Sequence, residues 1–81
     1  MDDVEIVQRI GQLADEEHTL ERSSQAGVGL SDDELARLRK VEVALDQCWD
    51  LLRQRRARRA AGRDVDDAAV RPENVVEGYK Q

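Results

Sequence analysis

The spacing of apolar residues along the chain predicts two amphipathic helices. Over about residues 4–24, apolar side chains recur at the four-and-three spacing of a helical seam, at Ile6, Ile10, Leu13 and Leu20. Over about residues 32–61, a wider apolar stripe follows the same spacing, at Leu35, Leu38, Val41, Leu45, Cys48, Trp49 and Leu52. Each predicted helix therefore has one face that must be covered.

The residues between and after these stripes predict where the helices start and end. Ser31 and Glu34 have the spacing of a capping box, in which each side chain binds the backbone N–H of the other, and the flanking Leu30 and Leu35 have that of a hydrophobic staple. Gly27 and Gly29 suit a tight reversal before that cap. Gly62 suits the C-terminal end of the second helix.

A short turn between two helices predicts an antiparallel hairpin. Aligning the two stripes about the turn pairs Ile10 with Leu45 and Ile6 with Trp49. We therefore predict an all-α fold in which residues 1–62 form a two-helix hairpin.

Residues 63–81 lack such a pattern. Pro72 interrupts any continuous helix, although it suits the first position of a short helical turn over residues 72–76. We expect an irregular tail, either folded back over the hairpin or mobile.

A two-helix hairpin leaves part of the second stripe uncovered. We expect a second copy to cover it, so that two hairpins form an antiparallel four-helix bundle. The tail of the same chain and a different protein are the alternative covers. The residues expected to mediate self-association are Val41, Leu45, Cys48, Trp49 and Leu52.

Composition limits the other ways in which this chain could be stabilised. With 81 residues it is long enough for one small domain, and with one cysteine, Cys48, it has no internal disulfide. No apolar run approaches the roughly 20 residues of a membrane-spanning helix, and the N-terminus is acidic where a signal peptide is basic. We expect a cytoplasmic protein without membrane contact.

The charge of the chain is unevenly distributed. The net charge is −5, yet residues 53–63 contain six arginines and no acid. Five of these, on the second helix, form a candidate partner-binding surface: Arg53, Arg55, Arg56, Arg58 and Arg59. Three roles are open for the arginines. They are internal neutralisation by acids such as Asp2, Asp3, Glu5, Asp64, Asp66 and Asp67, binding of an acidic protein, and binding of RNA or DNA phosphate.

The side chains capable of catalysis or metal binding form no complete site. Cys48 lies in the apolar stripe, where burial makes a thiol inert. Glu17 and His18 raise the alternative of a carboxylate-rich metal or small-molecule site, to which the second helix offers Glu42, Asp46 and Asp50. Asp46 and Asp50, however, are expected on a solvated face. For Glu17 the structural alternative is an ion pair with Arg37 or Arg39, or exposure at the edge of the seam. We expect no enzyme activity and no cofactor.

Two segments resemble a known family. They are Leu45-Asp46-Gln47-Cys48-Trp49-Asp50-Leu51-Leu52-Arg53-Gln54-Arg55-Arg56, and Val70-Arg71-Pro72 together with Val76-Glu77-Gly78-Tyr79. They are similar to a family of short actinobacterial proteins described as domain of unknown function 2630. The resemblance implies an actinobacterial, cytoplasmic protein and transfers no activity. The sequence thus predicts a non-enzymatic interaction or regulatory protein that acts as a self-associating hairpin, or alternatively a nucleic-acid-associated accessory protein.

Overall fold

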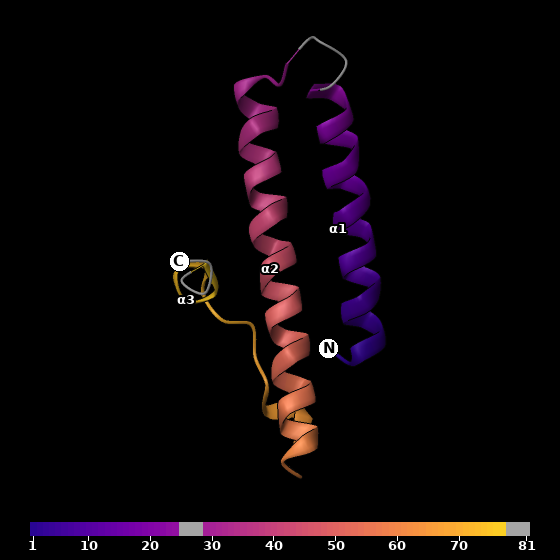
Figure 1. The fold of residues 1–81 in the computed structure, drawn as a ribbon, viewed down its shortest axis with the longest axis vertical. Helices are drawn as coiled ribbons and strands as arrows, with labels where there is room; N and C mark the ends of the chain where they lie inside the picture. The colour runs from indigo at the N-terminus through magenta and orange to yellow at the C-terminus, as the bar shows by residue number, and fades with distance from the viewer. Residues whose placement is uncertain (25–28, 78–81) are drawn as a thin grey trace.

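The computed structural model describes residues 1–24 and 29–77, and its two long helices lie close to where the sequence predicts them. Helix α1 spans Asp3–Ser23 and helix α2 spans Asp32–Ala60. They pack side by side in opposite directions, and α2 continues past the start of α1 (Figure 1). The predicted all-α hairpin is confirmed. Gly29 has the positive φ, 74°, expected before the second cap, whereas Gly27 lies outside the described residues.

Each long helix begins with a capping box. The predicted one is present before α2, where the Glu34 backbone N–H donates to Ser31 Oγ at 3.1 Å and the Ser31 N–H donates to Glu34 Oε1 at 3.0 Å. A second, unpredicted capping box joins Asp2 and Glu5 at the start of α1. It satisfies two backbone N–H groups that have no partner within the helix. Helix α1 therefore begins one residue before the predicted Val4.

Helix α2 ends at a glycine, as predicted. Gly62 has a φ of 71°, in the left-handed region. Its N–H donates to the Arg59 carbonyl at 3.2 Å, and the Arg63 N–H donates to the Arg58 carbonyl at 2.8 Å. This pair of hydrogen bonds is the Schellman motif, which closes the last turn after Ala60.

The core lies along the seam between the two helices. Buried side chains from both helices form one cluster, consisting of Ile6, Ile10, Leu13, Val41, Leu45, Leu51 and Leu52. The predicted pairing of Ile6 with Trp49 is wrong, because Ile6 is 0% exposed within this cluster whereas Trp49 is 45% exposed and lies outside it. Trp49 follows the seam residue Cys48, and each residue turns a helix by about 100°, so its side chain lies on the flank of the seam.

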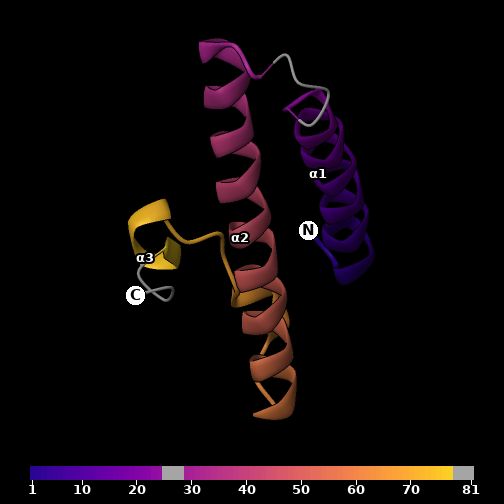
Figure 2. The same cartoon turned by 45° about the horizontal axis from the view of Figure 1, so that its top comes forward.

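The tail folds back along α2. It contains a 3-10 turn, η2 (Val65–Asp67), and a short helix, α3 (Glu73–Glu77), both of which pack against α2 (Figures 1 and 2). The predicted turn of helix after Pro72 is present, and the Pro72 carbonyl accepts from the Val76 N–H at 3.1 Å. Val76 is 3% exposed, so the tail adds a buried apolar residue of its own.

Candidate functional site

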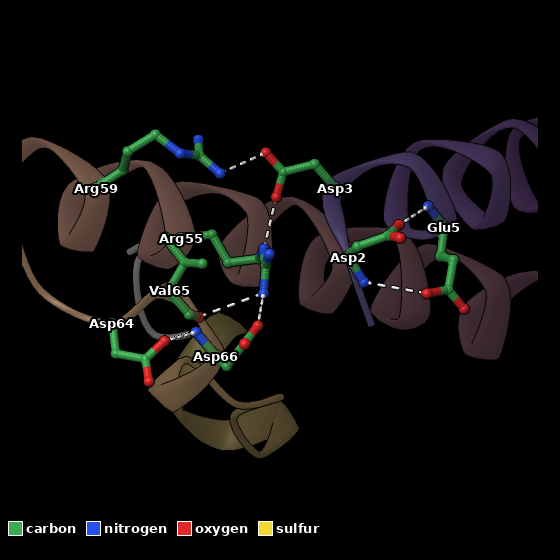
Figure 3. Close-up of polar contacts among 8 residues, drawn as sticks. All are labelled: Asp2, Asp3, Glu5, Arg55, Arg59, Asp64, Val65 and Asp66. Atoms are coloured by element: carbon green, nitrogen blue, oxygen red, sulfur yellow. Dashed lines mark hydrogen bonds and ion pairs between the residues drawn. The ribbon is translucent and has the colours of Figure 1, made fainter.

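The arginines at the end of α2 differ sharply in environment. The Arg55 side chain is only 7% exposed, and its Nε donates to Asp3 Oδ1 at 2.5 Å. Its Nη1 contacts the Val65 carbonyl and Asp66 of the tail. Arg59, from the next turn, donates to the other oxygen of Asp3 at 2.9 Å (Figure 3). Internal neutralisation, one of the three predicted roles, therefore accounts for Arg55 and Arg59.

Charge as well as hydrogen bonding stabilises the contact of Asp3 with Arg55 and Arg59. The bonds from Arg55, then from Arg59, hold the pKa of Asp3 below its ordinary value. The bond to Asp3 in turn raises the pKa of Arg55. Asp2 and Glu5, which were also expected to neutralise the arginines, instead form the capping box of α1 (Figure 3).

The position of Arg55 has a signal in the sequence. Arg55 lies three residues after Leu52 and Asp3 lies three residues before Ile6, so both occupy the next slot of their apolar stripes. The seam of the hairpin thus ends in the ion pair between Arg55 and Asp3, close to the N-terminus. Asp3 was expected among the acids that neutralise the arginines, but its pairing with Arg55 at the end of the seam was not predicted.

The remaining arginines form the exposed part of the block. None of the ion pairs within residues 1–24 and 29–77 uses Arg53, Arg56, Arg58 or Arg63. Arg53 and Arg56 are exposed, and Arg58 is half-buried. Arg55 is therefore buried within the candidate partner surface, whose exposed members are Arg53, Arg56 and Arg59, with Arg58 half-buried.

A second internal ion pair joins the tail to α2. The Arg71 guanidinium donates to both oxygens of Asp50, which is 1% exposed, and Gln54 donates to the same carboxylate at 2.9 Å. The bonds from Arg71 hold the pKa of Asp50 below its ordinary value. The expectation that Asp50 lies on a solvated face is wrong, because the tail covers it. Gln47 and Gln54 donate to backbone carbonyls of the tail as well.

The residues expected to mediate self-association fall into two groups. Val41, Leu45 and Leu52 are buried in the single chain, with 1%, 9% and 3% exposure. Cys48 is half-buried against the same core. Trp49 is the member of the set that remains exposed. A surface for a second copy is therefore reduced to Trp49 and its neighbours.

The neighbours of Trp49 repeat the spacing of the seam. We define the outer face of α2 as five residues with four-three-four-three spacing: Glu42, Asp46, Trp49, Arg53 and Arg56. The seam residues of α2, Val41, Leu45, Cys48, Leu52 and Arg55, have the same spacing one residue earlier. The outer face thus runs beside the seam and carries acids before Trp49 and arginines after it.

Acidic side chains crowd the first half of this face. Glu17 of α1 was expected to pair with Arg37 or Arg39, but Arg37 instead pairs with Glu16 at 2.5 Å. Partial burial, followed by the like charges of Glu21, Glu42 and Asp46, raises the pKa of Glu17. The carboxylates of both helices therefore repel one another at this place.

The groups suited to chemistry are dispersed. Burial raises the pKa of the Cys48 thiol, which disfavours the nucleophilic thiolate. His18 is exposed. Within the part of the chain that the structure describes, no three His, Cys, Asp or Glu side chains are grouped to hold a metal ion. The helices described there also include none long and apolar enough to span a bilayer.

Comparison with known proteins agrees with the resemblance seen in the sequence. A family model described as "Protein of unknown function (DUF2630)" matches residues 2–81. The uncharacterized protein Rv0898c of Mycobacterium tuberculosis is 47% identical over 77 residues, which cover 95% of this chain and 88% of the relative. The uncharacterized protein Mb0922c of Mycobacterium bovis matches to the same extent. No solved structure matches. The chain therefore belongs to the DUF2630 family of proteins of unknown function.

Proposed function

We propose that this chain is a small non-enzymatic interaction protein that works as a self-associating helical hairpin. The observation that carries the proposal is the exposure of Trp49, 45% of whose surface is accessible, while its neighbours Leu45, Leu51 and Leu52 on the same helix are buried. An aromatic side chain of this size contributes strongly to binding when a partner covers it, and tryptophan is enriched where interfaces derive most of their affinity.

The shape of the molecule supports this proposal. The described chain measures about 51 × 26 × 16 Å, so most of its side chains lie close to solvent. The tail covers one side of α2 through Asp50 and Gln54, and α1 covers another. The outer face is the remaining side. A partner placed there adds burial that neither α1 nor the tail provides.

Fluorescence tests the proposal directly, because Trp49 is the single tryptophan of the chain. We expect acrylamide to quench its emission less as the protein concentration rises, since pairing covers the indole. The same titration in concentrated urea is the control and should show no dependence on concentration. Quenching that stays constant across the concentration range in buffer would contradict self-association through Trp49.

The exposed arginines favour a second candidate function, the docking of an acidic protein. Arg58 and Arg63 line a shallow hollow at the free end of α2 and take part in none of the ion pairs among the described residues. A polyglutamate peptide should bind the wild-type protein and lose affinity for an Arg58→Gln, Arg63→Gln variant. A structured RNA of equal charge is the competing ligand, and preferential RNA binding with a steep salt dependence would instead favour a nucleic-acid role.

A further inference from the structure

We propose that the outer face of α2 binds the same face of a second copy in antiparallel orientation, with Trp49 near the two-fold axis and Glu42 of each chain opposite Arg56 of the other. This inference rests on the proposed self-association and specifies the surface and the register through which it occurs.

The positions of the charges match such an axis. Glu42 lies seven residues before Trp49 and Arg56 lies seven residues after it. Seven residues are about two helical turns, so both charges lie on the same side of α2 as Trp49 at about 10 Å from it in opposite directions. A two-fold axis through Trp49, perpendicular to the helix, brings each Glu42 to the partner's Arg56.

The outer face is therefore complementary to itself in one orientation. Two copies related by a two-fold axis use the same patch on both chains. In a parallel arrangement Glu42 would face Glu42 and Arg56 would face Arg56, which is repulsive. Antiparallel pairing replaces both repulsions with attractions. Charge thus selects the orientation, while the exposed indole of Trp49 supplies apolar area at the centre.

The two charges that define the register form no ion pair within the described ranges. None of the ion pairs there involves Glu42 or Arg56, whereas Arg55 and Arg59 of the same helix are engaged by Asp3. The crowding of Glu17 with Glu42 and Asp46 points the same way. A second copy would bring guanidinium groups to this acidic region, and like-charge repulsion within the chain would be relieved.

The tail leaves this surface accessible. Its hydrogen bonds to α2 run through Gln47, Asp50 and Gln54, which form a separate row on the helix, and through Arg55 of the seam. Figures 1 and 2 show the tail following one side of α2 while α1 lies along another. A second helix can therefore approach the outer face without displacing either.

Charge exchange between two variants tests the register. Glu42→Arg alone and Arg56→Glu alone each replace both intermolecular attractions with repulsions, so each should raise the dissociation constant of the homodimer about tenfold or more in low salt. An equimolar mixture of the two variants should associate with the wild-type affinity, because every pair then joins opposite charges. The double variant, with both substitutions in one chain, should also regain self-association. Sedimentation equilibrium reads out each case.

Matched reversals elsewhere on the surface serve as controls. Asp15→Arg and Arg63→Glu make the same changes of charge at exposed positions away from the outer face, and should leave the dissociation constant within about twofold. A wild-type dimer that is unchanged by Glu42→Arg and Arg56→Glu would overturn this register while leaving self-association intact. Variants that are weakened but do not recover on mixing would overturn it too. A wild-type protein that is monomeric at every concentration would overturn both this inference and the proposed function.

Discussion

Two stripes of α2 share one spacing and differ in what they contact. The seam stripe, from Val41 to Arg55, is apolar except at its last position and packs against α1. The outer face, one residue further on, has acids, one tryptophan and arginines in the same slots. We infer from this difference that the 29 residues of α2 serve two purposes. A continuous apolar stripe folds the hairpin, whereas a stripe that changes charge at its middle suits the same face of another copy.

Truncation in the seam should have the largest effect. Leu13 is 2% exposed in the core, so Leu13→Ala should lower the free energy of unfolding by about 2–5 kcal/mol through lost burial and a cavity. Val7→Ala, at a position that is 56% exposed on the same helix, is the control and should change it by less than about 0.5 kcal/mol. Urea unfolding followed by circular dichroism measures both. Equal effects of the two substitutions would break the distinction between the seam and the exposed surface.

Removing the guanidinium of Arg71, which binds Asp50, should have the next largest effect on stability. Arg71→Gln leaves a carboxylate that is 1% exposed without its guanidinium, and should lower the free energy of unfolding at pH 7 by about 1–3 kcal/mol. Arg63→Gln, at an exposed position outside the ion pairs of the described residues, is the matched control. An Arg71→Gln variant as stable as the Arg63→Gln variant would show that the tail is not held by this pair.

The same ion pair predicts a pH dependence. Because Arg71 lowers the pKa of Asp50 in the folded state, the carboxylate stabilises the fold above its unfolded pKa of about 4. That stabilisation disappears as the pH falls through the lower folded pKa. Thermal unfolding of wild-type protein and Arg71→Gln should therefore differ most near pH 7 and converge below about pH 4. A constant difference from pH 7 to pH 3 would be inconsistent with this linkage.

Substitution on the outer face should weaken association and leave the stability of the single chain nearly unchanged, in contrast to substitution in the seam. Trp49→Ala should raise the dissociation constant of the paired hairpins about tenfold, or about 1.4 kcal/mol, because the indole lies at the centre of the contact. In dilute solution the unfolding of the single chain should change little, since Trp49 lies outside the core cluster. Loss of stability in the dilute monomer without loss of association would contradict the separation of the two stripes.

Glu17 should give the smallest effect. Burial and neighbouring carboxylates raise its pKa, so the charged form costs stability near neutral pH and that cost falls as the pH drops through the raised value. Glu17→Gln should therefore stabilise the dilute monomer by up to about 0.5 kcal/mol. The gain should shrink at concentrations where hairpins pair, because the partner's arginines already relieve the repulsion. Glu5→Ala, which removes the acceptor of the Asp2 backbone N–H in the capping box, should destabilise and serves as the opposite control.

The hairpin could be predicted from sequence because its determinants are local. Apolar spacing, the Ser31 capping box and Gly62 each act within a few residues, and all three are present in the structure. The pairing of Asp50 with Arg71 joins residues 21 apart and leaves no local pattern. Trp49 was misplaced for a related reason. It was assigned to the apolar stripe, whereas its position one residue past the seam residue Cys48 leaves it 45% exposed.

The candidate surface was predictable only in part. The run of arginines is conspicuous in the sequence. Which of these arginines form internal ion pairs, however, depends on the acids that the fold brings near them. Asp3 reaches Arg55 and Arg59 across more than 50 residues, and that contact removes two of the six arginines between residues 53 and 63 from the set without a partner. The outer face, by contrast, has a local signal in its repeat, which becomes informative once Val41 and Leu45 are known to be buried.

The solution mass of the wild-type protein tests the central claim most directly. Sedimentation equilibrium over a wide concentration range in low salt should give a mass that rises from that of one chain, 9.2 kDa, to twice that value and no further, because a two-fold contact closes on itself. A mass that stays at 9.2 kDa throughout would contradict the claim that the outer face of α2 pairs two hairpins.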